Sequence, residues 1–364
     1  MGVCNSNNEI KNQKLSKNIE NDPDYILPKE YTIRKSISED YKMDSNFIGR
    51  GASGQVYIAQ NKKNEKFAIK TINKSHIKFK QSIISEVKIS LSLNHPHIVK
   101  CYNVYEDLKS ISFVLELIEG GDLFDFIKKY PAEHLDDDIA LEILIQILEI
   151  LNYLHNELRI CHRDIKLENF LISIIHDKPK IKIIDFGLSC YIPENNFMND
   201  FVGTLHYQAP EILERVKYSK MIDMWSTGIL FYIMLLGYFP FNSHDRNELE
   251  DMILYQNIDF SVIQNKDLRE LCEGLLEKHP DFRLSAIKAL DKACCIYEKM
   301  CSDDSYLKIR EDFLKIDIKK LGYVTWEQID SFYKNPKLNF DKYKKTNKVL
   351  NFSDFANLIY GIIY

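Results

Sequence analysis

The chain has 364 residues, which is more than one ordinary domain needs and enough for two or three. Hydrophobic residues make up 45% and charged residues 28%, as in a soluble globular protein, and the net charge of −5 gives no reason to expect nucleic-acid binding. The eight cysteines show no Cys-x-x-Cys pairing and no apolar secretory segment is evident, so free thiols in a reducing compartment are expected.

Residues 1–40 are predicted to form a mobile tail, because Asn, Lys and Ser are frequent at its start and large apolar residues are few. The opening sequence MGVCNS fits the pattern for myristoylation at Gly2. One myristoyl chain binds membranes weakly, at about 10⁴ M⁻¹, so palmitoylation of Cys4 would supply the second signal. The predicted location is cytoplasmic, at the inner face of a membrane; a flexible cytosolic tail with an incidental cysteine is the alternative.

Residues 41–118 have the pattern of a small β-rich lobe, with strand-like KFAIKTI and SFVLELI around a helical QSIISEVKISLSL. Within the same range, residues 49–56 (GRGASGQV) form a G-x-G-x-x-G-x-V element, whose glycines allow the backbone to approach phosphates closely. Lys70, at the end of a strand, could hold α- and β-phosphates, and Glu86 in the helical segment could pair with it. Taken alone, the glycines could simply join strands and Glu86 could be a solvated carboxylate.

Helical periodicities dominate residues 119–297. Two runs, 139–155 and 228–241, are apolar enough to raise the question of a membrane span. The first carries a polar stripe of glutamate and glutamine, and the second is too short for a bilayer and ends in Gly and Pro. Both are therefore predicted to be core helices of a large helical lobe.

Three motifs in this helical part carry chemistry. HRDIKLEN contains Asp164, which could accept a hydroxyl proton, Lys166, which could neutralise a transferring phosphate, and Asn169, an oxygen ligand for Mg²⁺. DFG adds Asp185, a hard carboxylate suited to Mg²⁺ bridging phosphates. GTLHYQAPE, with Thr204, follows. Each fragment alone could be a loop or a surface charge, but together with the glycine element and its lysine their order and spacing indicate phosphoryl transfer.

From about residue 41 to 297 the chain resembles a eukaryotic protein kinase, and GGDLFDFI, GYFPF and HPDFRLSA are similar to the calcium/calmodulin-regulated branch. Over nearly its whole length it resembles the calcium-dependent protein kinases of plants and protists, which join such a kinase to an EF-hand domain. The resemblance implies an α+β bilobal kinase fold, with a β-rich N-lobe over 41–118 and a helical C-lobe over 119–297. It also implies an ATP- and Mg²⁺-dependent enzyme that phosphorylates protein substrates, and Lys166 in DIKLEN resembles serine/threonine kinases.

The resemblance implies a role for individual residues. Asp164 would be the catalytic base, Lys166 would steady the γ-phosphoryl group, and Lys70 with Glu86 would hold the α- and β-phosphates. The residues implied to hold Mg²⁺ are Asn169 and Asp185. The residues implied to line the ATP site are Ile48, Gly49, Gly51, Gly54, Val56, Ala68, Lys70, Leu115, Glu116, Ile118 and Leu171. A pseudokinase scaffold is the competing class, but it normally lacks one of the essential lysine or aspartate residues, and none is missing here.

Other matching positions concern substrate and architecture. Asp122 and Glu168 match acidic positions that bind an arginine ahead of the phosphorylated residue, and Thr204 belongs to the same substrate region. Two solvated surface acids are the alternative. The residues implied to be structural are Arg163, Glu211, Asp223 and Arg283. Of these, Asp223 would brace the loop that contains Asp164, and Arg283 would pair with Glu211.

In the kinases that the chain resembles, the arginine at the position of Arg163 usually pairs with a phosphate on the activation segment. Here that segment, residues 188–202, has Ser189 close to the DFG and no central Ser or Thr. Glu194 or Asp200 is expected to supply a fixed negative charge instead, so activity should not require activation-loop phosphorylation.

Residues 302–364 have two helix–loop–helix patterns that resemble a small all-α EF-hand pair. In the first loop, counted from Asp317, Lys319 and Leu321 stand at positions 3 and 5, and Gln328 replaces the bidentate glutamate at position 12. The residues predicted to form the core of this pair are Phe313, Ile316, Trp326, Ile329, Phe332, Phe352, Phe355 and Leu358.

The second loop is aligned by pairing Leu350 with Val324 as short strands, which makes Tyr343 its first position. Lys345 then stands at position 3 and Asp354 at position 12. Both loops are predicted not to bind calcium, and the pair could dock a regulatory protein. The alternative is a kinase that responds to calcium through an unrecognised site.

Overall fold

The computed structural model describes residues 25–51, 54–77, 79–175 and 178–300, and shorter stretches at 312–313, 315–317, 323–332, 349–351 and 355. The chain forms two compact units, one of residues 1–93 and 100–118 and one of residues 94–99 and 119–364. The first unit ends at Ile118, the predicted lobe boundary, but residues 94–99 belong to the second unit. Among the described residues, no helix is long and apolar enough to cross a membrane.

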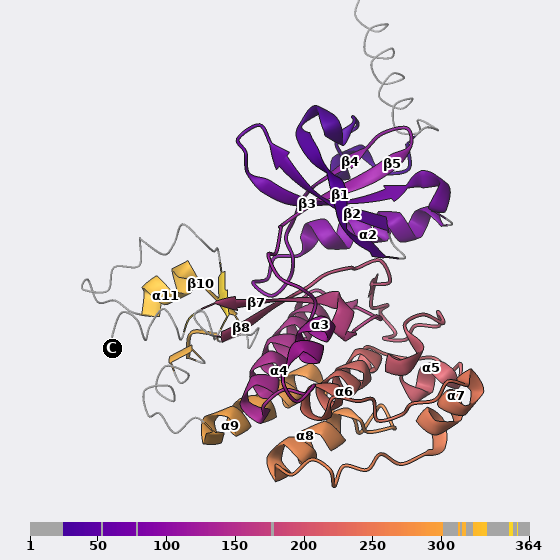
Figure 1. Ribbon diagram of the computed structural model, residues 1–364, viewed down its shortest axis with the longest axis vertical. Helices are drawn as coiled ribbons and strands as arrows, with labels where there is room; N and C mark the ends of the chain where they lie inside the picture. Colours follow the sequence, from indigo (N-terminus) through magenta and orange to yellow (C-terminus); the bar gives the residue numbers. More distant parts are fainter. Residues whose placement is uncertain are drawn as a thin grey trace, which may run out of the picture. The chain divides into compact units, whose positions relative to one another are not determined.

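The first unit is built on a five-stranded antiparallel sheet in the order β1-β2-β3-β5-β4 (Figure 1). Its strands are β1 (Tyr41–Gly51), β2 (Gly54–Asn61), β3 (Lys66–Asn73), β4 (Cys101–Glu106) and β5 (Ser110–Leu115). Alternation along β3 and β5 gives the sheet two buried faces. Ile69 and Val114 pack on one face, whereas Phe113 packs on the other.

Helix α2 (Lys80–Ser92) covers the face that carries Phe113 (Figure 1). Its residues Ile83 and Val87 lie one turn apart and are buried in the same cluster as Phe113 and Val104 of the sheet. This packing turns one side of α2 toward the sheet.

Residues 25–40 pack on the sheet, so the prediction that the mobile tail extends to residue 40 is wrong for them. Residues 25–33, which we name the N-terminal strap, include the 3₁₀ turn η1 (Lys29–Tyr31) and run along the edge strand β4. Ile33 N donates to Val104 O (2.8 Å), and Glu106 N donates to Ile33 O (3.0 Å). These are backbone bonds, which leave no hydrophobic periodicity by which the sequence could have revealed them.

The second unit is mainly helical. Its helices are α3 (Leu123–Lys129), α4 (Asp137–Asn152), which continues into the π-helical turn η4 (Tyr153–Glu157), α5 (Pro210–Leu213), α6 (Met221–Leu236), α7 (Arg246–Tyr255), α8 (Lys266–Leu275) and α9 (Ala286–Met300). The first run predicted to be a core helix, 139–155, is largely buried in α4 and η4. The second, 228–241, is buried as far as residue 235 in α6, but it continues past the end of that helix, where Tyr238 is 52% exposed. In the polar stripe of α4, Gln146 and Glu149 are buried and Glu142 is partly exposed. Gln146 donates to Pro179 O and accepts from Ile181 N. Helix α6 ends where Gly237 adopts a left-handed conformation (φ 81°).

After residue 300, strand β10 (Tyr323–Thr325) pairs antiparallel with β11 (Val349–Asn351), and helix α11 (Trp326–Phe332) follows β10. Val324 pairs with Leu350, which is the register that the sequence predicted. Phe332 is 39% exposed, so it does not belong to the predicted core. The predicted core residues that are buried are Phe313, Ile316, Trp326, Ile329 and Phe355. The others, Phe352 and Leu358, lie outside the described residues, as does Tyr343.

Candidate active site

A buried ion pair joins the sheet of the first unit to α2. Lys70 on β3 has its Nζ 2.9 Å from Glu86 Oε1, and the two side chains are about one-tenth exposed. Lys70 is the cross-strand partner of Phe113, so its side chain is on the face that α2 covers. Glu86 falls between Ile83 and Val87 on the inward side of α2. The predicted pairing of Lys70 with Glu86 is therefore confirmed.

The glycine element connects β1 to β2. Gly51 pairs with Gly54 and Gly49 pairs with Val56. Gly54 has φ +139°, and a Cβ there would lie 2.5 Å from Thr71 O. A side chain at Gly54 would thus require both a strained backbone and a displaced β3.

Four of the residues predicted to line the ATP site share one face of the sheet. Val56 pairs with Lys70 and Ala68 pairs with Leu115, and residues two apart on a strand point the same way. The side chains of these four residues therefore lie on the face that α2 also uses.

The other predicted ATP-site residues are divided between the two units. Ile48 lies on β1 and Ile118 follows β5. Glu116 N donates to Lys100 O (2.9 Å), so this N–H group is already used within the first unit. Leu171 lies in the second unit, where its backbone forms an isolated antiparallel β-bridge with Asp122.

A hairpin brings the two predicted Mg²⁺ ligands together. Strands β7 (Phe170–Ile175) and β8 (Lys178–Ile183) pair antiparallel, so Asn169 before β7 and Asp185 after β8 lie at the same end. Ile184 N donates to Asn169 O (2.8 Å), which continues this pairing. Asn169 Nδ2 donates to the carbonyl and carboxylate of Asp164, which fixes the orientation of the asparagine amide. One carboxylate and one amide oxygen are hard ligands that fit Mg²⁺.

Asp164 lies at the centre of a polar cluster in the second unit. Its Oδ2 is 2.6 Å from Lys166 Nζ and accepts from Asn169 Nδ2 (3.1 Å). Its Oδ1 accepts a hydrogen bond from the hydroxyl of Thr204 (2.9 Å), which also accepts from Lys166 Nζ (3.1 Å). The Asp164 carboxylate is thus held by Lys166 and Asn169, and it also accepts a hydrogen bond from the Thr204 hydroxyl.

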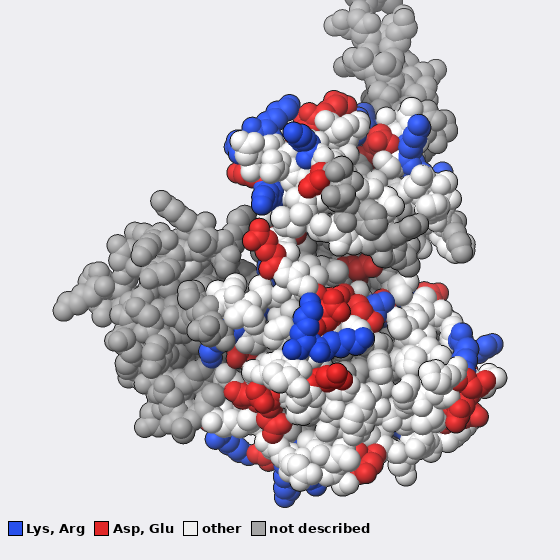
Figure 2. Space-filling view, in the orientation of Figure 1, with Lys and Arg blue, Asp and Glu red and all other residues white. Residues whose placement is uncertain are grey.

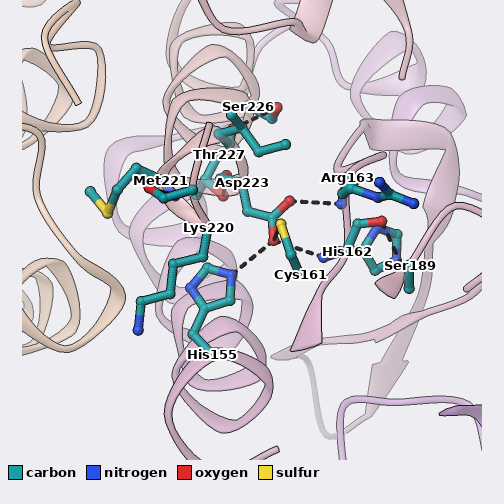
Figure 3. Close-up of polar contacts among 12 residues, drawn as sticks. His155, Cys161, His162, Arg163, Ser189, Lys220, Met221, Asp223, Ser226 and Thr227 are labelled. Carbon is teal, nitrogen blue, oxygen red and sulfur yellow. Dashed lines mark hydrogen bonds and ion pairs between the residues drawn. The ribbon is translucent and has the colours of Figure 1, made fainter. Parts of the chain in front are cut away.

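Asp223 on α6 fixes the backbone of residues 162–169, the HRDIKLEN segment that carries Asp164 and that we call the catalytic loop (Figure 3). Its Oδ2 accepts from His162 N (2.8 Å) and His155 Nε2 (2.8 Å), and its Oδ1 accepts from Arg163 N (2.8 Å). The thiol of Cys161 donates to the same carboxylate (3.3 Å). Burial alone would raise the pKa of Asp223, but the hydrogen bond and charge of His155 hold it below its ordinary value. The predicted bracing role is confirmed, and these bonds hold Arg163 at an unusual φ of 69°.

The side chain of Arg163 reaches the activation segment. Its Nη1 is 2.8 Å from Asp200 Oδ2, and its Nε donates to Leu188 O (2.6 Å). The hydroxyl of Tyr218 donates to Asp200 O (2.7 Å) and accepts from Arg163 (3.3 Å). Of the two acids that the sequence offered, Asp200 makes this pair, whereas Glu194 forms no ion pair with the arginine among the described residues.

Arg283 and Glu211 form the predicted ion pair, which is bidentate and buried. Nη1 and Nη2 of Arg283 lie 2.7 and 3.0 Å from the two carboxylate oxygens. The remaining N–H groups of the guanidinium donate to the carbonyls of Met221, Glu277 and Lys278. All five donors of the arginine are therefore used.

The predicted substrate residues have mixed outcomes. Asp122 caps α3 by accepting from Asp125 N (2.8 Å), a structural role that the sequence analysis did not anticipate. Glu168 is exposed in the catalytic loop. Thr204 contacts Asp164 and Lys166 directly. Gly2 and Cys4 lie outside the described residues.

Several contacting residues were missed. His155 and Cys161 on Asp223, and Tyr218 on Asp200, carry no local sequence signal, because their partners are far away in the chain.

Comparisons with known proteins agree with this geometry. The family model described as "Protein kinase domain" matches residues 43–294. Calcium-dependent protein kinase 33 of Arabidopsis thaliana is 38% identical over 256 residues, which are 68% of this chain and 48% of that protein. Calcium-dependent protein kinase 5 of Plasmodium falciparum is 40% identical over 215 residues, 58% of this chain and 37% of that protein. Serine/threonine-protein kinase RAD53 of Saccharomyces cerevisiae is 34% identical over 280 residues, which are 71% of this chain and 33% of that protein.

The chain therefore spans about half or less of the length of these curated relatives. The family match itself covers more than half of the chain and includes every residue described above as part of the catalytic cluster. The chain belongs to the protein kinase family.

Proposed function

We propose that the chain is a serine/threonine protein kinase that transfers the γ-phosphoryl group of ATP to an alcohol of a protein substrate. The observation that carries this proposal is the hydrogen bond from the Thr204 hydroxyl to Asp164 Oδ1 (2.9 Å). It demonstrates that an alcohol of the chemical type found in a substrate serine or threonine can donate to this carboxylate. Lys166 contacts both partners, as a cation that stabilises a transferring phosphoryl group should.

The chemistry expected of these residues is positioning and charge stabilisation. Lys70, held by Glu86, would bind the α- and β-phosphates, and Lys166 would bind the γ-phosphoryl group. Asp164 would orient the substrate hydroxyl and accept its proton. Mg²⁺ bound at Asn169 and Asp185 would neutralise phosphate charge.

The competing function is a kinase-fold scaffold that binds partners without chemistry. Scaffolds of this kind normally lack the lysine, the catalytic aspartate or the DFG aspartate, and the chain retains all three as Lys70, Asp164 and Asp185. The ion pair of Lys70 with Glu86 also favours an enzyme, since a scaffold has no need of it.

We further propose that calcium does not control the enzyme. Gln328, at the position of the bidentate glutamate, accepts from Thr325 N (2.7 Å) and donates to Ile316 O (3.3 Å). Gln328 N in turn donates to Thr325 Oγ1 (3.3 Å), so the two residues form a reciprocal cap at the start of α11. The Gln328 amide is thus bonded to the backbone at Ile316 and at the start of α11, and a neutral amide is a poor substitute for the bidentate carboxylate that calcium requires.

The test is phosphorylation of an arginine-containing serine peptide by the purified full chain with Mg-ATP, first in chelator and then in excess calcium. Equal rates in both conditions are expected, with Asp185→Asn as the inactive blank. A rate that appears only with calcium would contradict the calcium proposal and point to an unrecognised site. Absence of any rate above the blank would support the scaffold.

Activity should not require activation-loop phosphorylation, because Arg163 already forms an ion pair with Asp200. The Asp200 side chain is 70% exposed, and exposed ion pairs contribute roughly 0–1 kcal/mol. We therefore expect Asp200→Ala to lower kcat only about two- to fivefold. Glu194→Ala, which removes an equally negative residue of the same segment, is the matched control and should leave kcat unchanged.

The measurement is kcat of enzyme made without other kinases, before and after phosphatase treatment. Unchanged kcat on treatment is the expected result. A large loss on treatment would show that activity depends on a phosphate, and equal losses for the two alanine variants would show that the pair of Asp200 with Arg163 has no specific role.

Substrate preference and location form the last part of the proposal. Exposed Glu168 and partly exposed Asp122 support a basic substrate, and Figure 2 shows acidic and basic side chains interspersed on the visible face of the described residues. A mixed face suits protein partners better than nucleic acid. The motif at Gly2 and Cys4 supports attachment to the inner face of a membrane. The helical pair after residue 302 would serve as a docking module for a regulatory protein.

A further inference from the structure

We propose that the N-terminal strap positions α2 for catalysis, so that Leu27 and Tyr31 are positioning residues for the Lys70–Glu86 pair. The proposal rests on the proposed kinase function and names a part of that machinery outside the residues of the family match. All the contacts that carry it lie within the first unit.

The strap is anchored by a buried charge. Glu106, at the end of edge strand β4, has no exposed surface. Its carboxylate accepts hydrogen bonds from Ile26 N and Leu27 N (3.0 Å) and lies 2.8 Å from Lys74 Nζ. A buried carboxylate is stable only while its donors remain in place. Since the strap supplies two of them, leaving the sheet would expose the strap and also leave Glu106 poorly paired.

The anchored strap contacts α2 directly. Leu27 is 2% exposed and belongs to the same cluster as Ile83 and Val87. The Tyr31 ring lies 5.2 Å from Lys88 Nζ, a cation–π contact on the same helix. The strap therefore holds α2 through an apolar contact on its inner side and a second contact near its middle.

These contacts bear on Glu86 because it lies on the same part of α2. Glu86 is three residues after Ile83 and one before Val87, so any displacement of these two residues moves its carboxylate. Helix α2 follows Phe79, whose side chain makes no capping hydrogen bond, so local capping does not fix the start of the helix. An ion pair held at 2.9 Å is sensitive to shifts of about 1 Å, which is the scale on which misplacement impairs catalysis.

The experiment compares Leu27→Ala with Glu30→Ala in the full chain. Glu30 is an exposed strap residue, so its variant is the matched control and should behave as wild type. We expect Leu27→Ala to lower kcat/KM for ATP about tenfold, with a raised KM for ATP. Simple loss of folded enzyme would lower the apparent kcat and leave KM unchanged. Leu27→Met, which conserves volume, should restore both constants.

A double-mutant cycle tests whether the strap acts through Glu86. In a Glu86→Gln background, Leu27→Ala should change kcat/KM by no more than about twofold, since the pair that it disturbs is already gone. An undiminished tenfold loss in that background would overturn the proposal. Tyr31→Ala, which leaves Leu27 in place, gives the same comparison if Leu27→Ala does not fold.

Hydrogen exchange of the α2 amides, residues 80–92, provides a readout that does not need activity. Exchange should be faster in Leu27→Ala than in Glu30→Ala. Equal exchange and equal rates in both variants would overturn the strap proposal. If the wild type itself shows no phosphorylation, the proposed function fails, and the exchange comparison still decides whether the strap holds α2.

Discussion

Asp164→Asn should lower kcat for peptide phosphorylation by about 10²–10⁴-fold, the range typical of losing a general base. The carboxylate receives the Thr204 hydroxyl at 2.9 Å and lies 2.6 Å from Lys166 Nζ. Asparagine conserves the shape of the side chain but has neither the negative charge nor the basic oxygen. The KM for ATP should change little, because Asp164 is assigned to the substrate hydroxyl and not to the nucleotide.

The matched control is Asp251→Asn, the same exchange at an exposed position on α7. It should leave kcat and the thermal midpoint unchanged. The measurement is steady-state phosphorylation of the basic peptide, with thermal melting of both variants as a check on folding. If Asp164→Asn keeps more than about a tenth of wild-type kcat, the carboxylate is not the proton acceptor.

Arg283→Met should destabilise the second unit by about 3–5 kcal/mol, the effect of removing one member of a buried ion pair. Both partners are 4% exposed, so Glu211 would be left as a buried charge without its cation. Three backbone carbonyls, at Met221, Glu277 and Lys278, would lose their donor as well. The loss is large mainly because the Glu211 carboxylate is buried, whereas the three carbonyls belong to partly exposed residues.

Arg246→Ala provides the comparison, since it removes an arginine from an exposed pair with Glu250 on α7. That change should cost less than about 1 kcal/mol. Urea unfolding of the full chain, followed by a probe in the second unit, measures the two effects. Adding Glu211→Met to Arg283→Met should recover part of the stability, because the buried charge is then absent. Equal losses for the two single variants would mean that the buried pair is unimportant.

The parts of the fold and site that could be predicted from sequence are those encoded in short, ordered motifs. Lys70 lies within a β-rich run, three residues before the end of β3 and not at the strand end that the sequence predicted, and Glu86 lies in the next helical run, so their pairing follows from a few local elements. The two apolar runs could be assigned to the core because their lengths and polar residues exclude a bilayer. The pairing of Arg283 with Glu211, 72 positions apart, came from the family resemblance and not from any pattern in the sequence.

What could not be predicted depends on tertiary contacts without a periodic signature. Glu106 binds the strap through backbone N–H groups, which every residue carries. Thr204 was expected near substrate, but only the fold reveals that its hydroxyl reaches Asp164. The choice between Glu194 and Asp200 likewise depends on how the activation segment turns toward Arg163.

The strap also means that the sequence boundary of the domain and its physical boundary differ. A fragment beginning at residue 43, where the family match starts, would retain the catalytic cluster and the glycine element. It would lack Ile33 and the rest of the strap, so β4 would present unpaired N–H and C=O groups along a bare edge. Bare edges pair with other chains, and such a fragment would tend to aggregate. We therefore expect the isolated domain to stay soluble only when the chain from residue 25 onward is included.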